Sequence, residues 1–134
     1  LISFFMEEIL LYHQSLAEHE QQICTLLSSI ITKELNTSTC KIWHRHPVWF
    51  INNNPIVGYS KQKAGIRLMF WSGIDFHEPI LSVEGRKFKD ASVFFNAVNE
   101  IDIAIIKRCL HKSKIIQWDY KNLIKRKGKL LKVE

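Results

Sequence analysis

His44 and His46 are the two residues of this chain whose types and spacing come nearest to a metal site. Side chains two residues apart on a β-strand point to the same side, so two imidazoles there could bind one metal ion together. A metal site needs a third and usually a fourth ligand, which the sequence does not identify, although His77 and Glu78 occupy a loop that could approach. The alternative is a solvated or hydrogen-bonded pair beside a turn. We expect no tight iron or zinc site and no bound cofactor.

Trp43, Trp49 and Trp71 lie around this pair in the sequence. Ligand pockets are mostly apolar, with a few polar groups at fixed positions, so these rings could form the floor of a pocket. The alternative is that they pack into the core, as aromatic residues of neighbouring strands commonly do.

Sequence patterns of the common enzyme classes are absent. The chain holds no glycine-rich phosphate loop, no dinucleotide fingerprint, no serine nucleophile elbow and no H-E-x-x-H zinc motif. Its carboxylates are too scattered to nominate an acid and base pair. We therefore expect a non-enzymatic protein.

Cys24, Cys40 and Cys109 are far apart and include no C-x-x-C pair. This pattern predicts free thiols in a reducing compartment, so we expect a cytoplasmic protein. No apolar run approaches the ~20 residues of a membrane-spanning helix. The apolar start, residues 1–5, lacks the basic region and cleavage site of a signal peptide. A membrane is therefore not among the expected partners.

The N-terminal third is expected to be helical. Apolar residues at helical spacing predict a short helix over about 4–13 and a longer one over about 16–35. Ser15 and Glu18 have the spacing of a capping box, in which a hydroxyl and a carboxylate bind free amides at a helix start. The second helix is therefore expected to begin at Ser15.

β-Branched and aromatic residues dominate the middle of the chain, with Pro47 at an expected edge or bulge. Asn52–Asn54 and Ala64–Gly65 are typical of tight turns between strands. The pattern predicts strands over residues 41–51, 55–62, 66–72 and 91–96.

A last helix is expected from about residue 103, with Asp102 as its N-cap and an end at Gly128. The last residues, about 117–134, are expected to form a basic helical tail, where most of the excess of basic over acidic residues is concentrated. Basic residues interleaved with aromatic ones suit nucleic-acid binding, although no known nucleic-acid motif accompanies them, and a solvated helix face is the alternative. The candidate nucleic-acid contacts are Lys121, Lys125, Arg126, Lys127 and Lys129.

Helices followed by strands, then a strand and a helix, predict a single α+β domain over residues 1–134 with two layers and an antiparallel sheet. In the third strand Leu68 and Phe70 face one way, while Met69 and Trp71 face the other. Val57 and Tyr59 are expected beside Met69 and Trp71. An apolar second face is rarely left bare, so the C-terminal helix, a second subunit or a ligand should cover it. The predicted binding residues are Trp43, His44, His46, Trp49, Tyr59, Met69 and Trp71.

The order and spacing of several short motifs resemble the YdhG-like family, a set of small bacterial proteins described mostly as domains of unknown function. The resemblance covers roughly residues 6–130 and implies a two-layer α+β fold similar to secretion chaperones. The motifs are Ile42–His44 leading to Pro47, Pro55–Lys61, Leu68–Gly73, Glu84–Gly85 and Ile116–Asn122.

One group within that family is described as a frataxin-like intracellular iron chaperone, so the resemblance also implies an iron-binding role. Iron binding of that type relies on an acidic surface, because carboxylates are hard ligands. The present chain is basic, and the acidic residues of its first third lie only in the predicted N-terminal helices.

These observations lead to one functional expectation and an alternative. The chain is expected to be a non-enzymatic domain that binds a small ligand, a metal or a protein partner, a second copy included, through the second sheet face and its rim. The alternative is a nucleic-acid-associated protein that uses the basic C-terminal tail, and an enzyme of unknown chemistry comes third.

Overall fold

The computed structural model describes the backbone of residues 4–133 and the side chains from residue 6 onward. Much of the apolar start at residues 1–5 therefore lies outside the described residues. Among the described residues, no helix combines the length and the apolar character needed to cross a membrane.

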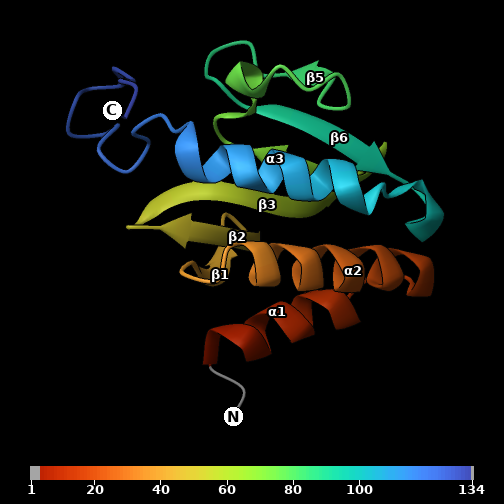
Figure 1. The fold of residues 1–134 in the computed structure, drawn as a ribbon. Helices are drawn as coiled ribbons and strands as arrows, with labels where there is room; N and C mark the ends of the chain where they lie inside the picture. Colours follow the sequence, from red (N-terminus) through yellow and green to blue (C-terminus); the bar gives the residue numbers. More distant parts are fainter. Residues whose placement is uncertain (1–3, 134) are drawn as a thin grey trace.

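Helices cover one face of an antiparallel sheet, which confirms the predicted two-layer α+β class (Figure 1). In Figure 1, α2 and α3 cross the same face of the sheet, and α1 lies beside α2. The strands are arranged in the order β1-β2-β3-β4-β6-β5. The elements are α1 (Phe4–Gln14), α2 (Glu18–Glu34), β1 (Thr39–Trp43), β2 (His46–Ile51), β3 (Asn54–Gln62), β4 (Gly65–Phe70), the 3-10 helix η1 (Gly73–Phe76), β5 (Val83–Glu84), β6 (Ala91–Phe95), the 3-10 helix η2 (Val98–Glu100) and α3 (Ile103–Ile115).

The single strand predicted over 41–51 is in fact two strands joined by a tight turn. His44 and Arg45 both have positive φ, at 51° and 74°, which suits a two-residue hairpin between β1 and β2. The aromatic and β-branched run gives no glycine, proline or asparagine signal at this point, so the sequence pattern hides the turn. The next hairpin turn, at Asn52 and Asn53, follows the prediction, with φ of 50° and 66°.

The predicted cap at Ser15 is wrong. The Ser15 hydroxyl donates to the carbonyl of Tyr12 at 2.6 Å, and α2 begins only at Glu18. A carboxylate protects the helix start instead, because Glu20 Oε1 accepts from the amide of Ala17 at 2.9 Å. This hydrogen bond is the main cause that lowers the pKa of Glu20.

The helix α3 begins as predicted and ends early. Asp102 caps it by accepting from the amide of Ile105 at 3.3 Å. It ends at Ile115, so the helical tail predicted over 117–134 is wrong: the described residues 116–133, called the C-terminal loop below, are not helical. Contacts with the sheet hold this segment in turns, which outweighs its helical pattern.

The main core lies between the sheet and the helices. Leu68 and Phe70 face it and are fully buried, as their position in the strand predicts. The prediction that Val57 and Tyr59 face the other way is wrong, because the β3–β4 register pairs Val57 with Phe70 and Tyr59 with Leu68. Residues paired across two strands lie on the same face of a sheet. Both residues therefore point toward the helices.

A buried carboxylate joins the segment after η1 to α3. The Glu78 side chain is 2% exposed and forms ion pairs with Arg108 at 2.6 Å and Lys112 at 2.5 Å. The hydrogen bonds from Arg108, followed by those from Lys112, lower the pKa of Glu78 from 4.5 to about 2. A depressed carboxyl pKa stabilises the folded state above the unfolded pKa near 4.5, and this contribution is lost as pH falls toward 2.

Glu20→Ala should lower the free energy of unfolding by about 1 kcal/mol, because the amide of Ala17 loses its acceptor. Ser15→Ala, the matched control two residues before Ala17, should change it by less than about 0.5 kcal/mol. Urea unfolding measures both. A larger loss for Ser15→Ala than for Glu20→Ala would contradict this assignment of the cap.

Glu78→Gln should lower the free energy of unfolding at pH 7 by about 1.5–3 kcal/mol, because a hydrogen bond to a charged group contributes about that much to stability. It should also reduce the loss of stability between pH 5 and pH 3, because the titrating carboxyl is gone. Urea unfolding at the two pH values checks this, with the exposed Glu84→Gln as control. An undiminished pH dependence in Glu78→Gln would contradict the assignment.

Candidate functional site

A second apolar cluster lies on the sheet face that points away from the helices. We call it the outer cluster. Met69 and Trp71 belong to it, so the prediction that they lie opposite Leu68 and Phe70 is confirmed. Its buried members are Val48, Phe50 and Trp71, and Trp43, Met69 and Tyr120 pack against them while remaining partly exposed.

Because Gly58 has no side chain, the aromatic rings of the outer cluster can approach the backbone of β3 closely. A Cβ atom added at Gly58 would lie 2.5 Å from the carbonyl oxygen of Pro47 and 3.4 Å from the indole of Trp71. The Trp71 ring therefore sits directly over the backbone of β3, where any side chain at position 58 would collide with its surroundings. Trp43 lies beside it, with 6.1 Å between the two ring centroids.

The C-terminal loop covers part of the outer cluster through Tyr120. The Tyr120 hydroxyl donates to the carbonyl of Trp71 at 2.6 Å and accepts from the amide of Lys89 at 3.0 Å. Burial raises the pKa of Tyr120 to about 12, so the hydroxyl stays protonated. The C-terminal segment, one of the three predicted covers, lies over part of the cluster, as a loop and not as a helix.

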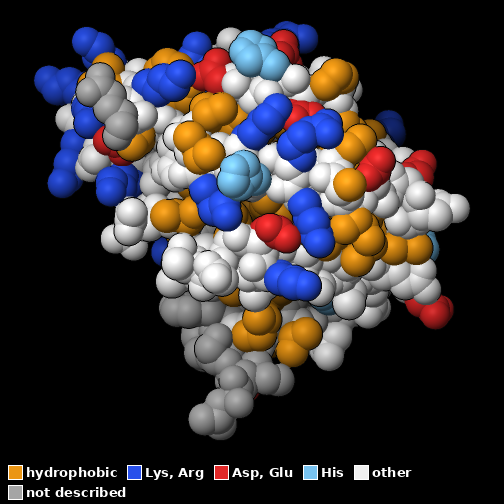
Figure 2. All heavy atoms as spheres, viewed as in Figure 1, with side chains coloured by type: hydrophobic (Ala, Val, Ile, Leu, Met, Phe, Trp, Pro, Cys, Tyr) orange, Lys and Arg blue, Asp and Glu red, His pale blue; other side chains and the backbone are white. Residues whose placement is uncertain are grey.

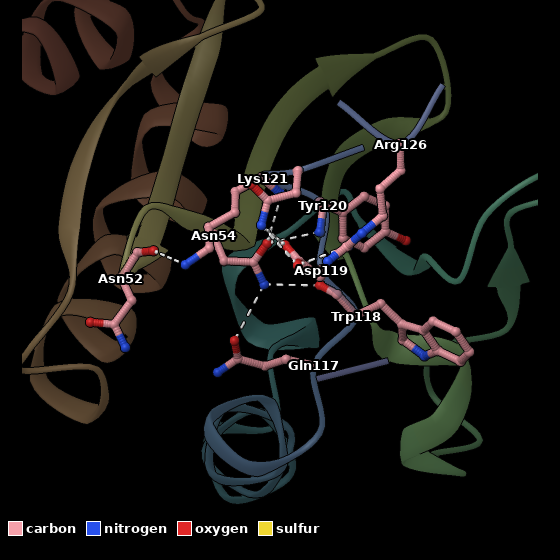
Figure 3. Close-up of polar contacts among 9 residues, drawn as sticks. Asn52, Asn54, Gln117, Trp118, Asp119, Tyr120, Lys121 and Arg126 are labelled. Carbon is pink, nitrogen blue, oxygen red and sulfur yellow. Dashed lines mark hydrogen bonds and ion pairs between the residues drawn. The ribbon is translucent and has the colours of Figure 1, made fainter. Parts of the chain in front are cut away.

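Asn54 holds this loop against the sheet (Figure 3). Its buried amide nitrogen donates to the carbonyl of Trp118 at 2.9 Å and to the side chain of Gln117 at 3.3 Å. Its amide oxygen accepts from the amides of Tyr120 at 3.0 Å and Lys121 at 3.1 Å. One side chain at the start of β3 therefore binds four groups of a segment more than sixty residues away.

Trp118 fixes the loop on the side of η1 and does not join the outer cluster. Its indole N–H donates to the carboxylate of Asp75 at 2.7 Å. The ammonium group of Lys89 lies 4.9 Å from its ring centroid, within the range of a cation–π contact.

An open cavity of about 300 Å³, called the loop cleft below, lies between the C-terminal loop and the first strands. Trp43, Phe50 and Tyr120 supply aromatic surface, and Lys41 and Lys121 supply positive charge. The Lys41 ammonium lies 4.9 Å from the Phe50 ring centroid. The remaining lining residues are Asn53, Pro55 and Ile124, so no described residue that lines the cleft is acidic.

The two histidines do not form the predicted pair on one strand face. His44 sits in the hairpin turn, exposed, with its ring centroid 4.1 Å from that of Trp43, whereas His46 begins β2 and is half-buried. The pKa of His46 is lowered, chiefly by burial. Glu78 is held by Arg108 and Lys112 on the helix side of the sheet.

Within the described residues, no group of three or more His, Cys, Asp or Glu side chains is arranged to hold a metal ion. The alternative, a solvated or hydrogen-bonded pair beside a turn, describes His44, which is exposed in the turn. It does not describe His46, whose Nδ1 is buried and has no hydrogen-bond partner among the described residues. The expectation of no tight iron or zinc site stays a prediction.

Trp49 and Tyr59, also predicted as binding residues, belong to the main core and not to the site. The Trp49 indole N–H donates to the hydroxyl of Thr32 in α2 at 3.3 Å. The Tyr59 hydroxyl lies 2.5 Å from the imidazole of the buried His13 in α1. Trp49 pairs with Val57 across β2 and β3, on the side of the sheet that faces the helices. The undivided strand predicted over 41–51 gives no sign of this pairing.

The basic residues of the C-terminal loop differ in how they are engaged. Arg126 forms an ion pair with Asp119 at 2.9 Å, and the Lys121 ammonium donates to the carbonyl of Asn52 at 3.1 Å. Three further lysines are exposed, and no side-chain partner is found for them within the described residues: Lys125, Lys127 and Lys129.

Sequence reasoning missed Asn54, Phe50 and Lys41. In the sequence, Asn54 is typical of a turn residue. Its role in holding the C-terminal loop becomes visible only from its contacts in the structure. Phe50 and Lys41 would have been assigned to the outer face from alternation alone, had the turn at His44 been recognised.

Comparisons with known proteins show the fold. No family model matches the chain, and no curated protein matches it. The crystal structure of a DUF1801 family protein, YdhG of Bacillus subtilis, matches with a TM-score of 0.62 at 12% identity, over 91% of this chain and 93% of that chain. This likeness confirms the two-layer α+β fold that the resemblance to the YdhG-like family implies, and at 12% identity it shows the fold alone.

Asn54→Ala should lower the free energy of unfolding by about 2–4 kcal/mol, because the amides of Tyr120 and Lys121 and the carbonyl of Trp118 lose a buried partner. It should also raise the binding of a hydrophobic dye as the loop leaves the outer cluster. Asn99→Ala, at an exposed asparagine in η2, is the control and should change neither quantity. Unchanged stability and dye binding in Asn54→Ala would show that the loop is held by other contacts.

Proposed function

We propose that this chain is a non-enzymatic binding domain whose loop cleft takes a small ligand that combines a planar ring with a negative charge. The observation that carries the proposal is the composition of the cleft: aromatic walls and two lysines, with no acidic residue among the described residues that line it.

The aromatic walls support the planar part of the ligand. Trp43 stands edge-on to Phe50, with 5.4 Å between ring centroids, and remains half-buried, so part of its indole is free to contact a ligand. Stacked and edge-to-face aromatic contacts add about 0.5–1.5 kcal/mol beyond burial of area. A planar ring gains most from such a surface.

The two lysines support the negative charge. Lys41 comes from β1 and Lys121 from the C-terminal loop, so one cation lies on the strand side of the cleft and one on the loop side. Each is already in a weak contact, Lys41 with a ring and Lys121 with one carbonyl, that an anion could replace at low cost.

The same lining supports a non-catalytic role. It provides no histidine, cysteine or carboxylate among the described residues, and its one phenol, Tyr120, is bound on both sides and has a raised pKa. General acid–base chemistry needs a group that exchanges protons near neutral pH. The iron-binding role that the YdhG-like resemblance implies for one group stays a prediction. A cytoplasmic location also stays one, and it is supported by three free cysteines.

The test uses two probes that share the naphthalene ring and differ in the charge of their polar group: the anion 1-naphthoate and the neutral 1-naphthalenemethanol. Naphthoate should bind about tenfold more tightly, because two lysines each contribute up to about 1 kcal/mol at a partly exposed site. It should shift the indole N–H resonance of Trp43 in NMR spectra and leave that of the buried Trp49 in place.

Lys41→Gln should weaken naphthoate binding by about threefold to fivefold. Lys63→Gln, in the exposed turn before β4, is the control and should leave it unchanged. Equal affinity for the two probes, or resonance shifts confined to residues outside the cleft, would refute the proposed function.

A further inference from the structure

We propose that the loop cleft is one end of a track for single-stranded nucleic acid, in which one base enters the cleft and the phosphates that follow lie along the lysines of the C-terminal loop. This inference rests on the proposed function, because it names the class of ligand that the cleft takes. It also uses exposed lysines of the C-terminal loop that do not line the cleft.

The first support is the state of the lysines beyond the cleft. Lys125, Lys127 and Lys129 are exposed, and their side chains have no partner among the described residues. Asp119 is the one acidic residue among the described residues of the loop. Its carboxylate is paired with Arg126 and also accepts a hydrogen bond from the Asn122 side chain at 2.9 Å. The charges of these three lysines are therefore uncompensated within their own segment, which favours contact with a polyanion.

The second support is a second basic segment that the fold brings beside the loop. The turn before β6 carries Arg86, Lys87 and Lys89. Lys89 contacts the loop twice, through its amide to Tyr120 and through its ammonium to Trp118. Figure 2 shows Lys and Arg side chains gathered at the end of the molecule that carries the C-terminal loop. Two basic segments thirty residues apart in sequence thus form one positive surface.

The third support is continuity between this surface and the cleft. Lys121 and Ile124 line the cleft and belong to the same loop as Lys125, which follows directly. Ile124 is 92% exposed, so it offers an apolar surface at the mouth of the cleft. A strand with a base in the cleft would therefore leave it beside the free lysines.

The combination favours a single strand over other polyanions. Unpaired bases stack on aromatic side chains while the backbone follows a positive groove, and each stacked base contributes about 1–3 kcal/mol. A duplex keeps its bases paired and cannot place one in a cleft between a loop and a sheet. An anionic membrane would meet the lysines and Ile124 but would make no use of Trp43 and Phe50.

The experiment measures binding of a fluorescent ten-nucleotide oligothymidylate, with thymidine monophosphate, a hairpin duplex and phosphatidylserine vesicles as comparisons. The oligonucleotide should bind more tightly than the other three. Its affinity should fall by about 20- to 50-fold between 50 and 200 mM salt, as expected for three or four phosphate contacts on a single strand.

Two triple variants of equal net charge separate the track from general attraction. Lys125→Gln/Lys127→Gln/Lys129→Gln should weaken oligonucleotide binding at least tenfold and reduce its salt dependence. It should leave binding of thymidine monophosphate and naphthoate within a factor of two. Lys33→Gln/Lys63→Gln/Lys114→Gln, at exposed lysines elsewhere, should weaken oligonucleotide binding less than threefold.

The results that contradict the track differ from those that contradict the proposed function. If the monophosphate and naphthoate bind in the cleft but the oligonucleotide binds no more tightly, the track is refuted and the proposed function stands. If the two triple variants weaken oligonucleotide binding equally, or if duplex or vesicles bind more tightly, the track is also refuted. If neither naphthoate nor the monophosphate binds in the cleft, both proposals fail.

Discussion

The buried amide of Asn54 is the interaction on which the outer side of this molecule depends. It is 3% exposed and fills both its donor and acceptor positions with groups of the C-terminal loop. An unpaired buried amide costs about 1–3 kcal/mol, so the loop and the start of β3 are stable only together. The position of Tyr120 over Trp71, and hence the shape of the loop cleft, follows from this contact.

The two faces of the sheet differ in how completely they are buried. The helix-facing side is packed with fully buried residues such as Leu68 and Phe70, and supplies most of the apolar burial that stabilises the fold. The outer side holds a smaller cluster that the loop covers only in part, leaving Trp43 half-buried. An apolar surface bordered by lysines and by a non-helical loop is a common setting for ligand binding, because loops carry variable contacts on a rigid sheet.

The fold class and the opposite faces of Leu68 and Met69 could be predicted from the sequence, because strong alternation and helical spacing report on burial. The division of residues 41–51 into two strands could not, because His44 and Arg45 take left-handed conformations that such residues rarely adopt. Without that turn, His44 and His46 were assigned to the same face of one strand, which suggested a possible metal site. The end of α3 was also missed, because the capture of residues 117–121 by Asn54 is a long-range contact without a local signal.

Hydrogen exchange of individual backbone amides in the C-terminal loop tests the central claim most directly. The amides of Tyr120 and Lys121 donate to the buried Asn54 side chain, whereas no acceptor is found for those of Ile124 and Lys125 within the described residues. The amides of Tyr120 and Lys121 should exchange at least a hundredfold more slowly than those of a free peptide, and the amides of Ile124 and Lys125 should exchange near the free-peptide rate. Rapid exchange at all four amides would contradict it, because the loop would then not be fixed to the sheet and the cleft would not be a stable site.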